Sequence, residues 1–363
     1  MTTVRPPLDP SEEKRSAKQR EARLLQIRRD AEAGARGAWA EPPMETALER
    51  TESQTGYYGL PVLKAPPWTW EIPIYFFVGG AAGAAAVIGS VAKWTDGDSE
   101  LIRDARWIAA VGGMISPALL VSDLGYPRRF LNMLRVFKVQ SPMSVGSWTL
   151  VVFSSSAAAA AFLSTVERHP GGLLRVFMNA ADMIAALSGT LLATYTGVLI
   201  GATAVPVWHE NISILPIHFA MSGLASATSI LELRGHETPA LNALGIAACA
   251  GETLIGAKIE LDQRRVSEPL KKGTSGWLTR IGGVLSGPLP LALRLLAGNS
   301  KSERSVKLRK AAAMSSIAGS LITRAAWIAA GRVSAKDPRL ELNRGRGIEI
   351  PDAETDHEKR IDN

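Results

Sequence analysis

The sequence predicts an all-α, polytopic membrane protein, a bundle of about eight transmembrane helices. The middle of the chain consists of apolar runs of about 20 residues, the length that a helix needs to cross a hydrocarbon core of about 30 Å. Charged residues gather instead at the two ends of the chain and in the short connectors between the runs. The mean hydropathy of +0.07 hides this pattern, because it averages the apolar middle with the polar ends.

The composition divides the chain into three regions. Residues 1–55 form a polar N-terminal tail, which we expect to be partly helical or disordered because its apolar residues are too few for a core. Residues 56–334 contain the apolar runs and form the transmembrane domain. Residues 335–363 form a polar C-terminal tail.

The apolar runs define the expected helices in chain order. The first begins after the Trp-Thr-Trp-Glu segment that ends at Glu71, the second ends at Asp123, and the third follows a turn that contains Pro142. Pro288 and Pro290 interrupt the seventh, so we expect that helix to be broken or tilted. The eight ranges are about 72–93, 104–122, 145–166, 179–205, 212–232, 239–259, 277–297 and 309–331.

The net charge of +7 and the pI near 9.6 reflect membrane topology and not nucleic-acid binding. The Lys and Arg residues lie in tails and connectors that flank apolar runs, where they contact lipid headgroups and set the orientation. Basic residues are nearly balanced between the two sets of connectors. We favour a cytoplasmic N-terminus, since a long charged tail is seldom translocated without a signal.

Ionisable side chains within the apolar runs are the first candidates for function, because a charge at membrane depth is costly. We expect Glu71 and Asp123 to lie at the same membrane face, since successive helices alternate in direction. Glu252 and Arg324 have two interpretations, a structural ion pair or a functional pair. Asp182 lies near the end of its run, and we expect it to be solvated.

The sequence lacks the ligands for redox cofactors. Of five histidines we expect only His218 to be buried, whereas a bis-histidine haem needs two facing imidazoles. One cysteine, Cys249, cannot hold an iron–sulfur cluster. No metal-ligand spacing or nucleotide loop is present. The expectation is a protein with no haem, no iron–sulfur cluster and no metal site, whose electrons are carried by a partner.

Several short motifs follow one another in an order that is typical of a known family. They are Tyr57–Pro61 with Trp68–Gly80, Asp123–Phe130, Pro142–Trp148, Tyr195–Trp208 and Arg324–Pro338. Through these motifs, residues 57–338 resemble the NrfD/PsrC integral membrane subunits of polysulfide reductase. The sequence departs from the family pattern at Tyr126, where Arg is common.

The resemblance implies a membrane anchor that binds menaquinone or another quinone as its substrate and is not an autonomous enzyme. It implies a ferredoxin-like iron–sulfur subunit and a molybdopterin catalytic subunit as partners, and a multi-pass position in the inner (plasma) membrane of a prokaryote. The implied quinone contacts are Trp70, Glu71, Tyr75, Asp123 and Arg129.

Further roles follow from the chemistry of such a subunit. Quinol oxidation releases two protons, and a carboxylate at a semi-buried site accepts one, with Glu71 the first choice and Asp123 the second. Asp182, Glu252 and Arg324 are candidates for a proton path across the membrane. Arg128, Arg135 and Lys138 are candidates for the surface that docks the iron–sulfur partner.

Two alternatives remain open. Broken helices and intramembrane charges also suit an ion or solute transporter, although the inverted repeat that this class often shows is not visible. A purely structural membrane anchor is the other alternative.

Overall fold

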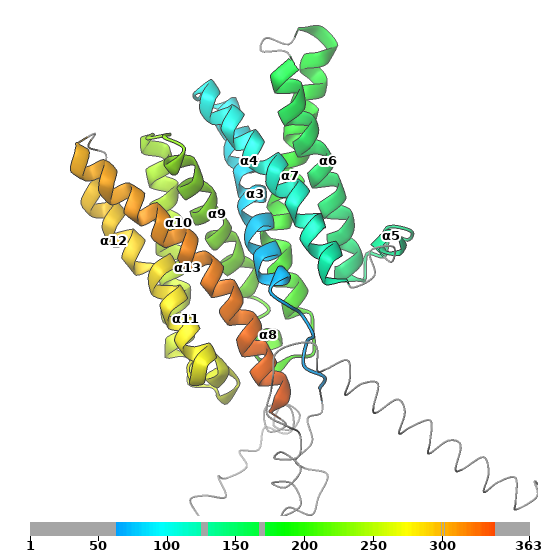
Figure 1. The fold of residues 1–363 in the computed structure, drawn as a ribbon, viewed down its shortest axis with the longest axis vertical. Coiled ribbons are helices and arrows are strands. Elements are labelled where there is room, and N and C mark those ends of the chain that lie inside the picture. The colour runs from blue at the N-terminus through cyan, green and yellow to red at the C-terminus, as the bar shows by residue number, and fades with distance from the viewer. Residues whose placement is uncertain (1–62, 125–129, 167–170, 299, 301, 338–363) are drawn as a thin grey trace, which may run out of the picture. The chain divides into compact units, whose positions relative to one another are not determined.

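The computed structural model describes residues 63–124, 130–166, 171–298, 300 and 302–337. All of these belong to one unit that begins at Leu60. Every regular element in the described ranges is helical, which confirms the predicted fold class (Figure 1). The predicted tail over 1–55 and almost all of the tail over 335–363 lie outside the described residues, so their boundaries stay predictions.

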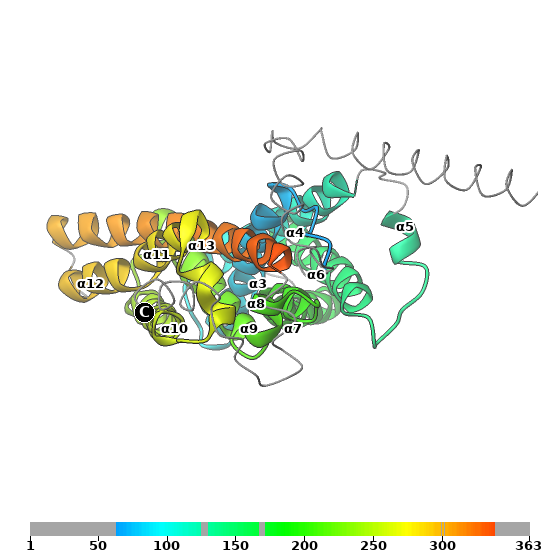
Figure 2. The ribbon, with the colours of Figure 1, turned by 90° about the horizontal axis from the view of Figure 1, so that it is seen from below.

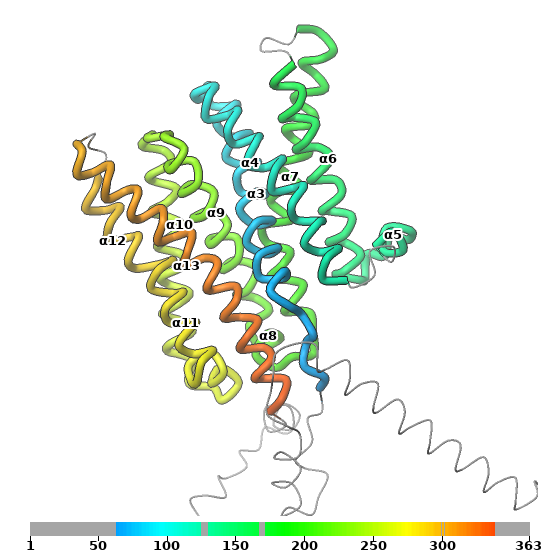
Figure 3. The backbone as a smooth tube through the Cα atoms, viewed as in Figure 1, coloured from blue at the N-terminus to red at the C-terminus, as the bar shows by residue number. Residues whose placement is uncertain are grey.

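Four long helices form the first group. They are α3 (Glu71–Trp94), α4 (Ser99–Asp123), α6 (Pro142–Val166) and α7 (Gly172–Gly201), with the short α5 (Phe130–Met133) between α4 and α6. Helix α3 packs against α4 and α7, and α6 packs against the same two helices. The group is therefore a closed set of four neighbours (Figure 3).

The remaining helices form a second group. They are α8 (Pro206–Glu210), α9 (Leu215–Leu233), α10 (Pro239–Leu261), the 3₁₀ helix η3 (Arg265–Leu270), α11 (Gly273–Ser286), α12 (Pro288–Ala297) and α13 (Glu303–Lys336). Helix α13 packs along both α11 and α12, while α9 packs on α10 and α13 and also on α3 and α7. In Figure 2, α3 and α9 accordingly lie between the α4–α7 helices and the α10–α13 helices.

The seventh predicted helix is broken, as expected. Helix α11 ends at Ser286 and α12 begins at Pro288, with Gly287 between them at φ −106° and ψ −95°. Proline has no amide proton to continue the helical hydrogen-bond ladder, and Pro288 occupies the first helical position, where none is needed.

Five of the described helices are long and apolar enough to cross a membrane: α3, α4, α6, α7 and α10. At the other predicted positions lie α9, the α11–α12 pair and α13. Their buried faces carry serine, glutamate and arginine, and α11 and α13 also carry exposed charges such as Arg280 and Lys307; both lower the hydropathy. Polar groups turned toward the interior of a bundle are the tolerated arrangement at this depth.

Three helices have a side-chain cap at their N-terminus. Asp98 accepts from the amide of Glu100 at the start of α4, and Ser302 accepts from Ser305 at the start of α13. Thr238 caps α10 in the same way. Short polar side chains before the first turn satisfy amides that have no helical partner. Helices α4 and α13 consequently begin five or six residues before the start that hydropathy predicts.

Glycines allow α3 to approach two helices at backbone distance. A Cβ atom on Gly83 would lie 2.3 Å from the carbonyl oxygen of Gly189 in α7. One turn earlier, a Cβ atom on Gly223 of α9 would lie 2.8 Å from the carbonyl oxygen of Gly80. Lipid offers no hydrophobic drive between helices, so small residues that permit such contacts hold a bundle together.

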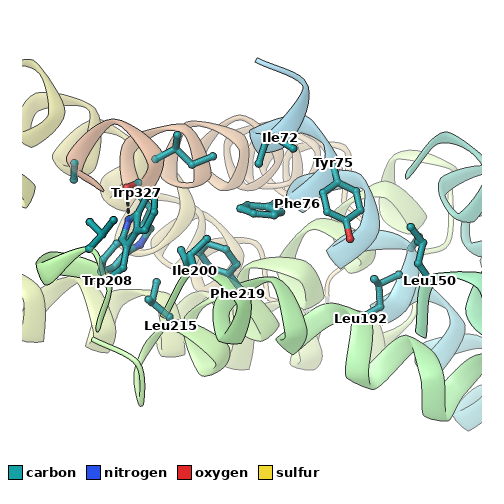
Figure 4. Close-up of a cluster of buried hydrophobic side chains, with 14 of the residues drawn as sticks. Ile72, Tyr75, Phe76, Leu150, Leu192, Ile200, Trp208, Leu215, Phe219 and Trp327 are labelled. Atoms are coloured by element: carbon teal, nitrogen blue, oxygen red, sulfur yellow. Dashed lines mark hydrogen bonds between the residues drawn. The ribbon is translucent and has the colours of Figure 1, made fainter. Parts of the chain in front are cut away.

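Aromatic side chains fill the core at the end where α3 begins. Trp208 of α8 is fully buried, and its indole donates to the carbonyl of Trp327 in α13 at 2.8 Å (Figure 4). Trp68 stacks on Trp208 at 5.4 Å between ring centroids. Gly331 makes this possible, because a Cβ atom there would lie 2.0 Å from the Trp208 ring.

We predict that Gly83→Ala destabilises the protein by about 1–3 kcal/mol, the usual cost of overpacking. The new methyl group meets the backbone of α7, which cannot rotate away. Gly256→Ala in α10 is the matched control: its Cβ atom has no heavy atom within 4 Å. The measurement is unfolding of the purified protein in detergent. Equal stability of the two variants would contradict the role given to the α3–α7 contact.

Candidate functional site

Thr69 joins the two carboxylates that the sequence places at one membrane face. Its backbone amide lies 3.2 Å from Asp123 Oδ1 and its hydroxyl 2.9 Å from the same oxygen. The hydroxyl also contacts Glu71 Oε2. The first turn of α3 and the last turn of α4 are thereby brought together, as the alternation of helix direction predicts.

This arrangement has a consequence for protons. A threonine hydroxyl has one proton to donate and can accept others. It satisfies both carboxyl groups when one of them is protonated and donates to the hydroxyl oxygen. Thr69 therefore links Glu71 and Asp123 through a single hydroxyl group, and both carboxyl groups are only partly buried.

The other predicted quinone contacts lie at different depths. Trp70 is 62% exposed beside Glu71, whereas Tyr75 is 2% exposed one turn deeper in α3. Glu71 and Tyr75 are four residues apart and share a helix face. In Figure 4, Tyr75 projects on the side of Leu150 and Leu192, away from Trp208 and Trp327. Arg129 and Arg128 lie outside the described residues.

Asp182 lies at the opposite end of the first group, and the expectation that it is solvated was wrong. It is buried and accepts from Lys93 at 2.6 Å. Arg106 binds both of its oxygens, at 2.9 and 2.6 Å. This cluster joins α3, α4 and α7 far from Glu71 along the helix axis, because Lys93 lies at the end of the helix that Glu71 begins.

Glu252 is 1% exposed and faces His218 in the second group. Its Oε2 lies 3.3 Å from His218 Nε2 and accepts from Ser286 at 2.8 Å. The indole of Trp327 donates to His218 Nδ1 at 3.2 Å. A neutral His218 therefore carries its proton on Nε2, toward Glu252. Within the described residues, Glu252 Oε1 has no hydrogen-bond partner.

Arg324 is fully buried but does not form the direct ion pair with Glu252 that the sequence left open. Its guanidinium donates to Ser222 Oγ at 2.6 Å and to the carbonyl of Phe219 at 3.3 Å. It also lies over the rings of Phe77 and Phe219, 5.9 and 5.2 Å from their centroids. The positive charge of Arg324 is thus stabilised by hydroxyl, carbonyl and aromatic groups, and not by a carboxylate. The two aromatic rings contribute through cation–π attraction.

A series of contacts links the start of α3 to Glu252. Trp68, next to Thr69, stacks on Trp208, and Trp208 donates to the carbonyl of Trp327. Trp327 in turn donates to His218, which faces Glu252. Packing and hydrogen bonds therefore connect the two carboxylate sites through α8 and α13.

Sequence reasoning missed a second buried pair, Glu232 with Arg294. Their side chains are 2.6 Å apart, and Arg294 also donates to Ser229 at 3.2 Å. The spacing of polar residues along α9 could have indicated this buried pair. His218, Ser222, Ser226, Ser229 and Glu232 recur at intervals of three and four residues and share one helix face.

His236 is a second correction, since only His218 was expected to be buried. His236 is also buried, and its Nε2 lies 3.1 Å from Asp104 Oδ2 at the start of α4.

Among the residues that the structure describes, no group of three or more His, Cys, Asp or Glu side chains is placed to hold a metal ion. Cys249 is buried 3.7 Å from Ser316 Oγ.

Two polar connectors lie outside the membrane-crossing helices. In the one between α10 and α11, a hydrogen bond from Arg264 holds the pKa of Asp262 well below its usual range. Arg264 also binds Glu210 at 2.9 Å, which braces α8, the helix that carries Trp208. In the connector before α6, Arg135 and Lys138 are exposed.

Comparison with known proteins shows that residues 62–234 of the protein are similar to a known family. Residues 62–234 match the family described as Polysulphide reductase, NrfD. The C subunit of polysulfide reductase from Wolinella succinogenes is 27% identical over 183 residues, which cover 45% of this protein and 56% of that relative. The match thus spans a little more than half the length of the relative. The family match runs from the segment before α3 to the end of α9 and includes Thr69, Glu71 and Asp123.

We predict that Asp182→Asn destabilises the protein by about 3 kcal/mol, because breaking a buried pair leaves the charges of Lys93 and Arg106 uncompensated. Glu303→Gln is the control, since it breaks an exposed pair with Lys307 and costs less than about 0.5 kcal/mol. Unfolding in detergent measures both. A stability for Asp182→Asn equal to that of the control would show that the cluster does not hold α3, α4 and α7 together.

Proposed function

We propose that this protein, whose residues 62–234 match the family described as Polysulphide reductase, NrfD, is the quinone-reactive membrane subunit of a multi-subunit oxidoreductase. In this proposal it binds menaquinone or another quinone and exchanges electrons with a ferredoxin-like iron–sulfur subunit. That subunit joins it to a molybdopterin catalytic subunit, in the inner membrane of a prokaryote.

The observation that carries the proposal is the pair of carboxyl groups held by Thr69. Quinol oxidation releases two electrons and two protons, and reduction takes up the same number. The electrons pass to or from the iron–sulfur partner. Glu71, with Asp123 joined to it through Thr69, exchanges one proton with the quinone at the membrane boundary.

Neighbouring residues supply the rest of the proposed pocket. Trp70 offers an exposed indole next to Glu71, at the depth where Trp is favoured in membrane proteins. Tyr75 marks the deeper wall on the same helix face. Arg129, which follows the end of α4 in the sequence, is proposed as a donor to a quinone oxygen.

The partner surface is proposed next to this site. Arg135 and Lys138 are exposed in the connector between α4 and α6, on the side of the bundle where α4 ends. We propose that these two residues bind an acidic face of the iron–sulfur subunit, and that Arg128, which lies outside the described residues, takes part.

A proton path through the second group is a separate proposal. His218, Glu252 and Ser286 form a buried hydrogen-bonded set, and Trp208 and Trp327 connect it with the start of α3. In this path Glu252 is the proton carrier, and Arg324 sets the local potential. Asp182 belongs to a different cluster, so we propose for it at most a role at the far membrane face.

The broken helix α11–α12 favours one alternative to the quinone-reactive subunit, an ion or solute transporter. The break at Gly287 lies within the bundle, and beyond it Arg294 is buried against Glu232. Broken helices and buried charges also build translocation sites. Quinone-linked turnover of the Glu71 and Asp123 variants separates this alternative from the proposed function.

We predict that Glu71→Gln and Asp123→Asn each lower quinone-linked turnover of the assembled complex about 100-fold, the lower end of the effect of a positioned acid or base. Glu100→Gln is the matched control, because Glu100 is exposed at the opposite end of the bundle. Subunit composition after purification checks that each variant assembles. Full turnover in both variants would leave a structural anchor or a transporter as the function.

We predict that Glu252→Gln abolishes proton translocation by the complex in vesicles, whereas quinone-linked electron transfer continues. The amide keeps the size of the side chain but carries no exchangeable charge. Glu303→Gln, on an exposed turn of α13, should alter neither activity. Unchanged proton translocation in Glu252→Gln would remove this residue from the path.

A further inference from the structure

A groove of about 490 Å³ opens on the side of the bundle between α4 and α9. Phe77 of α3 lies in its floor, Trp107 and Val111 of α4 form one wall, and Ile230 of α9 forms the other. Its volume is within the range of about 300–1,000 Å³ of ligand sites. The groove is predominantly apolar, and Val111 is 48% exposed in it.

The groove exists because α4 packs closely against α3 on one side and leaves a gap to α9 on the other. A Cβ atom on Gly112 would lie 2.5 Å from the Cβ atom of Ala82, so α3 and α4 pack at very short range. Helices α4 and α9 hardly touch. Helix α3 therefore forms a floor between two separated walls.

The groove has the length of one membrane leaflet. Its α4 wall runs from Asp104 to Ile115, and a helix rises about 1.5 Å per residue, which gives about 16 Å. A hydrocarbon core is about 30 Å thick, so this is about half of it. The end at Asp104 lies where α4 begins and α9 ends, at the membrane boundary opposite the Glu71 site (Figure 3).

Arg234 closes the groove at that boundary. Its Nε donates to Asp104 at 3.1 Å, and its side chain is 61% exposed. Within the described residues, its two terminal nitrogens have no hydrogen-bond acceptor, and Arg103 lies on the other side of Asp104 at 3.8 Å. The terminal nitrogens of an arginine fork match the oxygens of a phosphate.

We propose that this groove binds one glycerophospholipid of the surrounding leaflet. An acyl chain lies between Trp107, Val111 and Ile230, and the lipid phosphate binds Arg234. An apolar channel one leaflet long with an arginine at its interfacial end fits this ligand in both length and charge. The site is distinct from the Glu71–Asp123 site and independent of quinone chemistry, so its test can fail while the proposed function stands.

The test is native mass spectrometry of the purified full-length protein in detergent, titrated with phosphatidylglycerol and with the diacylglycerol of the same acyl composition. We expect phosphatidylglycerol to bind about fivefold more tightly, which corresponds to about 1 kcal/mol for a basic residue near the membrane surface. Arg234→Gln should remove this preference. Arg304→Gln, exposed at the same membrane boundary, should keep it.

A second pair of variants tests the apolar part. Val111→Trp fills the groove and should reduce binding of both lipids at least fivefold, whereas Leu187→Trp, at an exposed position of α7 outside the groove, should not. Three results would overturn the proposal. They are equal binding of the two lipids to the unaltered protein, full binding by Val111→Trp, and displacement of the phospholipid by an equal concentration of menaquinone.

Discussion

The fold depends on how closely α3 approaches its neighbours. In lipid, helices gain little from burying apolar surface, so association requires backbone contact and polar bonds. Gly83 meets Gly189 of α7 and Gly80 meets Gly223 of α9, which places α3 between the two helix groups. The same absence of a side chain at Gly80 leaves room for the Arg324 guanidinium, because a Cβ atom there would lie 2.9 Å from its Nη2. One set of small residues thus fixes both the packing and the position of a buried charge.

Charged side chains are distributed differently in the two helix groups. In the first group charged side chains lie near the helix ends, where Glu71 and Asp123 meet at one face and Asp182 meets Arg106 near the other. In the second group, polar side chains follow α9 through the interior from His218 to Glu232. Each buried charge there is compensated by a partner or by several dipoles, which keeps the cost of burial low.

The aromatic cluster around Trp208 joins these parts. It holds the segment before α3 against α8 and α13 through stacking and through the bond from Trp208 to Trp327. Trp68 stacks on Trp208, Trp208 donates to the carbonyl of Trp327, and the indole of Trp327 donates to His218. The segments around Trp68, Trp208 and Gly331 are distant in sequence, and in the structure they form this single contact region.

The sequence by itself determined the helical class, the break before Pro288, and the meeting of Glu71 with Asp123, because apolar length, proline chemistry and alternating helix direction are local properties. It did not determine what surrounds a buried charge. The position of Asp182 near the end of an apolar run predicts a solvated side chain, whereas α3 and α4 supply Lys93 and Arg106 to it. Glu252 has His218 and not Arg324 as its partner. These outcomes depend on which faces of distant helices meet. Only the tertiary structure decides that, because in a membrane the faces meet wherever small residues allow backbones to touch.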